Sequence, residues 1–80
     1  MQVSLNGTLR SDADGASTIE IEASTIRELM TRLEDRFPQM QDHLDEGIAV
    51  AIDGVIYRDD WTQPIPASAD VVLIPRIKGG

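Results

Sequence analysis

The chain has no cysteine and only one histidine among its 80 residues, and it contains one residue each of Trp, Tyr and Phe. Without thiols it can form no disulfide, hold no metal through thiolates and carry no thiol nucleophile. No apolar stretch approaches the roughly 20 residues that a membrane-spanning helix needs, and residues 1–4 do not look like a signal peptide. We therefore expect a cytoplasmic protein with no membrane contact.

Basic residues are also few, seven against 14 acidic ones, which gives a net charge of −7. Binding of nucleic acid depends on clustered lysine and arginine that displace counterions, so we expect no nucleic acid partner. The acidic excess has two interpretations. It either keeps the surface soluble or steers the protein toward a basic partner, and composition does not separate the two.

The motifs of common active sites are missing as well. There is no glycine-rich phosphate loop. A Ser/His/Asp set is not expected, because the only histidine, His43, lies in a short charged segment where an exposed imidazole is the simplest interpretation. Asp12 and Asp14 before Gly15 match only part of a calcium loop, so no metal site is expected. We therefore expect no catalytic residue, no bound cofactor and no activity of the chain on its own.

What the sequence does contain is one strongly amphipathic helix. Apolar residues recur at helical spacing within residues 26–37 and form a single stripe, made of Ile26, Leu29, Met30, Leu33 and Phe37. Thr25 and Glu28 fit a capping box, in which each side chain satisfies a free backbone N–H group. Pro38 ends the helix, because the residue before a proline disfavours helical backbone angles. A second, shorter helix is predicted over residues 39–46.

Short apolar segments around this helix predict five strands, over residues 2–5, 18–22, 48–52, 55–57 and 71–74. Residues 11–17 are polar and rich in turn formers, which indicates a surface loop. Asp53-Gly54 is the strongest hairpin signal, because a type I′ turn needs positive φ at both central residues. Residues 71–74 are apolar on both faces, as expected of a central strand covered by a helix.

Trp61 and Ile65, in the connection before the last strand, are expected to close the rim of the core. Together the elements predict an α+β protein with a β-grasp (ubiquitin-like) fold, a mixed sheet of four to five strands wrapped around one main helix. The predicted domain covers residues 1–75. Residues 76–80, called the tail from here on, are expected to be flexible.

The end of the chain adds a more specific signal. The apolar run 71–75 leads to a terminal Gly79-Gly80. This ending, together with the β-grasp pattern, resembles the family of ubiquitin-like sulfur carriers, whose best-known members are the small subunit of molybdopterin synthase and the thiamine-pathway sulfur carrier. Other residues also fall where the family's pattern places such residues: Asp53-Gly54 at the hairpin, Ile65, and Asp70-Val71-Val72.

The chain departs from the family's pattern at two places. Ala69 stands where a glycine is common, which requires a turn that avoids positive φ or tolerates strain. Arg76 and Lys78 stand where family members tend to have small or apolar residues. The second departure leaves the particular partner open.

The resemblance implies a role for the tail. A separate adenylating enzyme of the E1 type would use ATP and magnesium to activate the Gly80 carboxylate, and a persulfide would convert it into a thiocarboxylate. The chain would thus be a carrier subunit of a sulfurtransferase or synthase complex. Gly79 would give the tail clearance in a narrow channel, and the residues expected to contact the partner are Pro75, Arg76, Ile77 and Lys78.

The length near 80 looks more like the molybdopterin type than the shorter thiamine type. The expected sulfur acceptor is therefore the large subunit of a synthase of the molybdopterin synthase type, in molybdenum cofactor biosynthesis. Three alternatives stay open. They are a sulfur carrier for thiamine or another pathway, a ubiquitin-like modifier attached through Gly80 to lysines of target proteins, and a β-grasp interaction module with an incidental Gly-Gly end.

Overall fold

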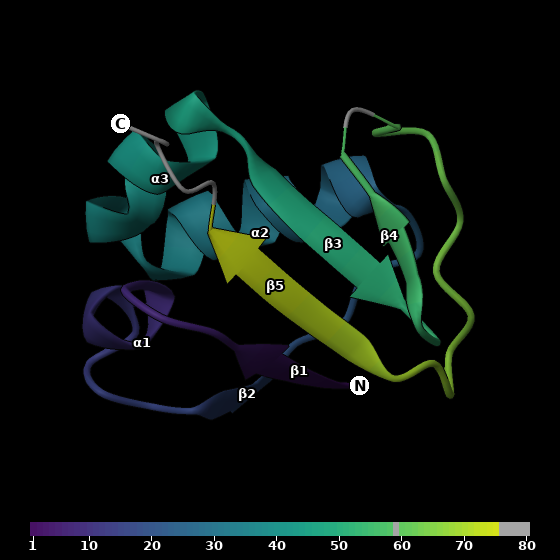
Figure 1. The fold of residues 1–80 in the computed structure, drawn as a ribbon, viewed down its shortest axis with the longest axis horizontal. Coiled ribbons are helices and arrows are strands. Elements are labelled where there is room, and N and C mark those ends of the chain that lie inside the picture. The colour runs from purple at the N-terminus through teal and green to yellow at the C-terminus, as the bar shows by residue number, and fades with distance from the viewer. Residues whose placement is uncertain (59, 76–80) are drawn as a thin grey trace.

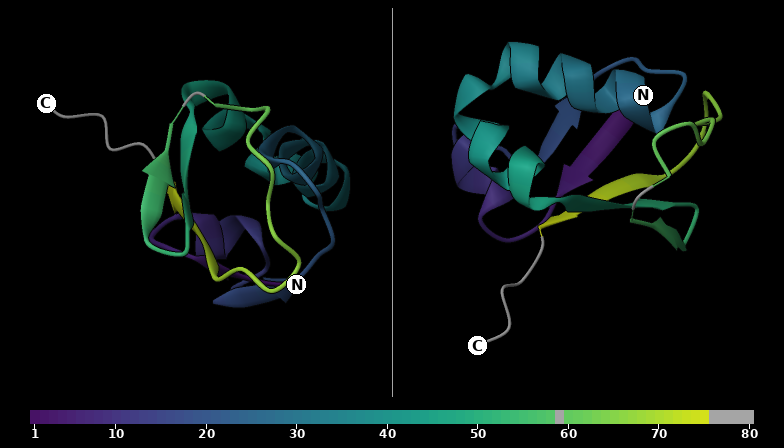
Figure 2. Two further views of the ribbon diagram at one scale, coloured as in Figure 1. Left: turned by 90° about the vertical axis from the view of Figure 1, so that its right-hand side faces the viewer. Right: turned by 90° about the horizontal axis from the view of Figure 1, so that it is seen from above.

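A computed structural model describes residues 1–58 and 60–75. In these ranges the elements follow in the order β1 (Gln2–Leu5), α1 (Leu9–Asp12), β2 (Thr18–Glu20), α2 (Ile26–Arg36), the 3₁₀ helix η1 (Pro38–Met40), α3 (Gln41–Glu46), β3 (Ile48–Ile52), β4 (Val55–Tyr57) and β5 (Val71–Pro75). The strands form one sheet, and α2 crosses one of its faces (Figures 1 and 2). The predicted β-grasp fold is confirmed.

The sheet has the strand order β2-β1-β5-β3-β4. Its last strand in sequence, β5, is the central strand, and it runs parallel to β1 and antiparallel to β3. The pairs β1–β2 and β3–β4 are both antiparallel. The sheet is therefore mixed, as expected, because the pair β1–β5 is parallel and the other pairs are antiparallel.

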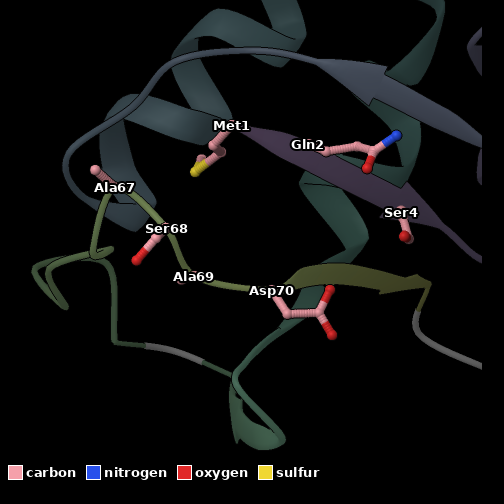
Figure 3. A pocket seen from close by; sticks show the side chains of 7 residues that line it. All are labelled: Met1, Gln2, Ser4, Ala67, Ser68, Ala69 and Asp70. Atoms are coloured by element: carbon pink, nitrogen blue, oxygen red, sulfur yellow. The ribbon is translucent and has the colours of Figure 1, made fainter.

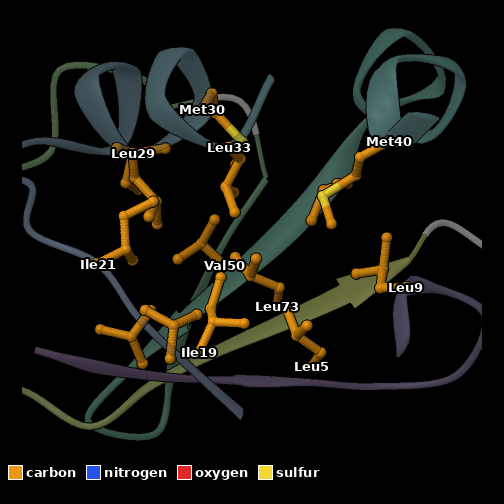
Figure 4. Close-up of a cluster of buried hydrophobic side chains, with 14 of the residues drawn as sticks. Leu5, Leu9, Ile19, Ile21, Leu29, Met30, Leu33, Met40, Val50 and Leu73 are labelled. Carbon is orange, nitrogen blue, oxygen red and sulfur yellow. The ribbon is translucent and has the colours of Figure 1, made fainter. Parts of the chain in front are cut away.

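The hydrophobic core lies between α2 and the inner face of the sheet (Figure 4). The whole apolar stripe of the predicted helix is buried, including Phe37, which follows the last residue of α2. Alternate residues of the central strands, among them Val50 of β3 and Leu73 of β5, face this stripe. Fully burying such a side chain stabilises the fold by about 1.5–3 kcal/mol relative to leaving it exposed.

The capping box is confirmed, with one shift. The Thr25 hydroxyl accepts a hydrogen bond from the Glu28 N–H at 3.2 Å. The Glu28 carboxylate in turn accepts from the N–H of Ser24, at 3.1 Å, one residue earlier than a standard capping box. Two free donors at the start of α2 are thus satisfied.

The structure corrects the first part of the surface loop predicted over residues 11–17, while residues 14–17 lie outside any helix or strand as expected. Residues 9–12 form the short helix α1, and both Leu9 and Ala13 are buried. These two residues are four positions apart, so they share one side of a single helical turn. A single turn is too short to produce a periodic pattern in the sequence, so the prediction did not detect it.

The strand predicted over residues 18–22 ends earlier, at Glu20, and the helix predicted over residues 39–46 is divided into η1 and α3. Two turn predictions hold. The short helix α3 ends at Gly47, which has a φ of 104°. The hairpin turn has positive φ at both Asp53 (50°) and Gly54 (86°), as a type I′ turn requires. None of the helices in the described ranges is long and apolar enough to cross a membrane.

Candidate functional site

Pro75 is the last described residue before the tail, and it ends the central strand β5. It pairs with Ile48 at the start of β3. The predicted site residues Arg76, Ile77, Lys78, Gly79 and Gly80 lie outside the described residues. Of the predicted site, the structure therefore places Pro75 alone.

Two properties of Pro75 define where the tail begins. Its ring fixes φ near −65°, and it has no N–H to donate, so it limits the hydrogen-bonded ladder at this end of β5. On the β1 side the ladder continues one step past the last strand pair, because the N–H of Asn6 donates to the carbonyl of Leu73 at 3.1 Å. The tail therefore starts from the middle of the sheet, next to the turn that follows β1.

Gly7 in that turn lies near Pro75. It has a φ of +58°, and a Cβ atom added to it would lie 3.4 Å from the Cγ atom of Pro75, which is an ordinary contact distance. The backbone conformation, which only glycine adopts readily, is therefore what favours glycine here. The sequence analysis considered Asn6-Gly7 as a turn or a bulge, and it did not connect this dipeptide with the site.

The predicted central position of β5 is confirmed, and the outer face of the sheet beside Pro75 is apolar. Val71 and Leu73 are fully buried, whereas Val72 and Ile74 are only partly covered. Register places Ala49 beside Ile74, and Ala51 between Val72 and Ile56, which is 52% exposed. We call Val72, Ile74, Ala49, Ala51 and Ile56 the outer patch.

His43 is not the isolated exposed imidazole that the sequence analysis expected. Its Nδ1 atom forms a short contact with the carboxylate of Asp12, and its Nε2 atom lies 3.1 Å from the hydroxyl of Thr8. The structure thus brings together a hydroxyl, an imidazole and a carboxylate that the sequence analysis did not connect. These residues lie 31 and 35 positions from His43, and no local pattern could have indicated the contacts.

Trp61 also differs from its prediction, since it is 42% exposed rather than packed into the rim of the core. The Arg27 guanidinium lies over its ring, 6.0 Å from the centroid, and the Arg27 N–H donates to its carbonyl. Ile65, by contrast, is buried as predicted. The connection before β5 is therefore attached to the start of α2 through backbone hydrogen bonds of Trp61, Gln63 and Ile65.

A shallow cleft of about 340 Å³ lies at the opposite end of β5, between the start of β1 and the turn before β5 (Figure 3). Its lining is mostly small and polar, made of Met1, Gln2, Ser4, Ala67, Ser68, Ala69 and Asp70. No group of three or more metal-ligating side chains occurs in residues 1–58 and 60–75. The cleft therefore lies away from Pro75 and brings no set of catalytic side chains to it.

The fold and the origin of the tail at the end of the central strand define a β-grasp domain of the ubiquitin-like type. The profile of the ThiS family matches residues 3–80. The chain therefore belongs to this family of ubiquitin-like sulfur carriers. No curated protein sequence matches the chain.

Solved structures show the same fold at low sequence identity. A putative molybdopterin converting factor, subunit 1, from Pyrococcus furiosus is 19% identical with a TM-score of 0.78, and 95% of each chain is covered. A chain of the BexX/CysO complex from Amycolatopsis orientalis is 18% identical with a TM-score of 0.77, covering 99% of this chain and 98% of that one. The small archaeal modifier protein 1 from Methanosarcina acetivorans is 19% identical with a TM-score of 0.73, covering 99% and 94%.

Proposed function

We propose that the chain carries sulfur as a thiocarboxylate on Gly80. The observation that carries this proposal is that the match to the sulfur carrier family extends through the terminal Gly79-Gly80. The position of Pro75 at the end of the central strand is consistent with it, since a rigid sheet then supports the base of the tail. The proposal requires that Gly80 bear a free carboxylate.

The chemistry needs activation because a carboxylate is a poor electrophile. The Gly80 carboxylate attacks the α-phosphorus of ATP on a separate adenylating enzyme, and pyrophosphate leaves. The terminal sulfur of a persulfide then attacks the acyl carbon and AMP leaves, after which a thiol reduces the resulting acyl disulfide to the thiocarboxylate. Magnesium accompanies ATP on the enzyme. This chain supplies only the acceptor carboxylate, so it is a group carrier and not a catalyst.

The composition of the tail suits delivery into a narrow site. Its five residues span at most about 17 Å when fully extended, which is enough to bring Gly80 into a buried site while the domain remains outside. Side chains at positions 79 and 80 would widen the tail and restrict its backbone angles. Arg76, Ile77 and Lys78 would contact the partner at the entrance.

The outer patch is proposed as the surface that docks on the partner enzymes. It lies beside Pro75 and keeps apolar side chains partly exposed, as protein interaction sites often do. For the sulfur acceptor we propose the large subunit of a molybdopterin synthase type, in molybdenum cofactor biosynthesis. The length of the chain and its likeness to a putative molybdopterin converting factor support this choice.

A second candidate is attachment of Gly80 to lysines of other proteins. It is favoured by the likeness to a structure named as a small archaeal modifier protein. Both functions begin with the same adenylate, so they differ only in the group that attacks it.

The experiment that separates these functions is the intact mass of the protein after incubation with an adenylating enzyme from the same host, ATP and a persulfide donor. The sulfur carrier predicts a mass gain equal to the replacement of one oxygen by sulfur. Isopeptide-linked adducts in host extract would instead support the modifier. If the protein forms neither product and no adenylate, the proposed function is wrong and a β-grasp interaction module remains.

A further inference from the structure

Three side chains, from α3, from α1 and from the residue before α1, form a continuous polar chain near Pro75. His43 on α3 contacts the Asp12 carboxylate through Nδ1 and the Thr8 hydroxyl through Nε2. The side chains of His43 and Asp12 are only 27% and 16% exposed. Because both ring nitrogens have partners, the orientation of the imidazole is fixed from two sides.

Thr8 makes this contact in place of its usual local one. A threonine before a helix ordinarily accepts a hydrogen bond from an N–H group of the first turn. Thr8 has helical backbone angles, with φ −66° and ψ −16°, and makes no such bond. Its hydroxyl instead connects the turn over residues 6–8 to α3. Since the four residues of α1 are too few to form a helix stable by itself, contacts with the rest of the protein must hold this segment.

The same turn lies beside Pro75. Asn6 is hydrogen-bonded to Leu73 of β5, and a Cβ atom added to Gly7 would lie 3.4 Å from the Cγ atom of Pro75. Thr8 follows directly. A displacement of the turn would therefore remove the neighbour that packs against the last residue of β5.

We propose that Thr8, His43 and Asp12 form a clasp that holds the turn over residues 6–8 against Pro75 and thereby fixes the direction in which the tail leaves the sheet. The three are positioning residues, because they act through Pro75 and not on the reacting carboxylate. Only the effect of the clasp on adenylation rests on the proposed function. The clasp itself is a property of the folded chain.

Each ring nitrogen of His43 has its own partner in the clasp. The Nδ1 atom faces the Asp12 carboxylate, which only accepts hydrogen bonds, so the ring donates there. The Nε2 atom faces the Thr8 hydroxyl, which can donate or accept.

The nearby arginines have other partners. Arg10 donates to the Leu5 carbonyl and Arg36 donates to the Glu20 carbonyl. Neither arginine therefore replaces His43 as the partner of Asp12.

The first test uses the protein alone. The nuclear Overhauser contact between Gly7 and Pro75 is measured in the wild type and in Thr8→Val, which removes the hydroxyl and keeps the branched shape. Loss of one hydrogen bond should shift the balance between the engaged and displaced turn roughly fivefold, so the contact weakens in Thr8→Val. Thr8→Ser should restore it. An equally strong contact in Thr8→Val would overturn the clasp.

Asp12→Asn provides the charge test, with Asp14→Asn as its matched control. Asp14 lies in the same segment and has a φ of 58°, which asparagine tolerates. We expect the Gly7–Pro75 contact to weaken in Asp12→Asn, because a neutral amide accepts a weaker hydrogen bond from the ring than a carboxylate does, and to stay unchanged in Asp14→Asn. Equal weakening in both variants would mean that overall charge, and not the clasp, causes it.

The second test measures the adenylation of Gly80 by the activating enzyme. If the turn is displaced part of the time, a smaller fraction of the protein molecules presents the tail in the direction that the enzyme binds. The KM for the protein should therefore rise roughly fivefold in Thr8→Val while kcat is unchanged. Wild-type protein that is adenylated with the same KM as Thr8→Val would contradict the effect on the tail. Wild-type protein that is never adenylated would instead disprove the proposed function, and the Gly7–Pro75 contact would still decide the clasp.

Discussion

Asp53 and Asp70 hold each other through two hydrogen bonds of 2.9 Å each. The N–H of Asp53 donates to the Asp70 carbonyl, and the N–H of Asp70 donates to the Asp53 carboxylate. Asp53 lies in the hairpin turn between β3 and β4, and Asp70 directly precedes β5. The pair therefore attaches the hairpin to the start of the strand that leads to the tail.

The backbone conformation of the turn before β5 explains how Ala69 can stand where the family commonly has glycine. In the described part of the chain, the non-glycine residues with positive φ are Asp14 and Asp53. Ala69 is not among them, so its side chain meets no backbone strain. Its methyl group is buried, and the turn is closed by the hydrogen bond from its N–H to the Pro66 carbonyl.

Asp53→Ala should lower the free energy of unfolding by roughly 1–3 kcal/mol. It removes one hydrogen bond, and it places alanine at a positive φ that asparagine, aspartate and glycine adopt more readily. Asp53→Asn is the matched control. Its amide oxygen can accept the same bond and asparagine tolerates this conformation, so its stability should stay near that of the wild type. Urea denaturation measures both. Equal losses in the two variants would show that the pair contributes nothing specific.

Ile56→Ser should weaken binding to the adenylating enzyme roughly tenfold, because it removes an apolar side chain from the outer patch. Val55→Ser is the control on the same strand. Val55 is similarly exposed, at 54%, but pairs with buried Ile52 and so faces the other side of the sheet. Calorimetric titration of the enzyme with each variant gives the affinities. If the two variants lost affinity equally, docking through the outer patch would be wrong.

Gly79→Val and Gly80→Ala should each abolish sulfur transfer without lowering the melting temperature. Both positions follow the domain predicted over residues 1–75, so we expect an added side chain to hinder passage into the partner's site and not folding. Thiocarboxylate formation followed by mass spectrometry, together with thermal unfolding, checks both halves of the prediction. Full activity in either variant would remove the tail from the mechanism.

The amino terminus predicts a pH dependence of stability. The Met1 ammonium contacts Glu22 and lies 3.1 Å from Glu20, and hydrogen bonds to these carboxylates raise its pKa above the ordinary value of 8.0. A raised pKa contributes stability that is complete below the unfolded-state value and is lost as the pH rises through the folded-state value. In protein with an unmodified Met1, the urea midpoint should therefore fall as the pH rises above 8.0.

Glu22→Gln should reduce this fall, because Glu22 is the largest cause of the raised pKa. Glu34→Gln removes the same charge from an exposed position on α2 and should leave the fall unchanged. Parallel urea titrations at several pH values compare the three proteins. Identical profiles for wild type and Glu22→Gln would rule out a contribution from this ion pair.

The sequence by itself was enough to predict the features that depend on local patterns. The stripe of α2 and its cap, the Asp53-Gly54 hairpin and the alternation of the strands all follow from residues within a few positions of one another. These features limit the fold to a mixed sheet around one helix. The terminal Gly79-Gly80 added the candidate function, because its signal also lies within a short stretch of sequence.

Tertiary structure decided whatever depends on residues that are distant in sequence. The exposure of Trp61 and of one face of β5 depends on which elements pack against them, and residue type alone does not specify this. The contact of Gly7 with Pro75 joins residues at opposite ends of the chain, and the clasp of Thr8, Asp12 and His43 joins two helices separated by α2. Hydrogen bonds and packing act over a few ångströms in space, so only the folded chain determines which of these side chains meet.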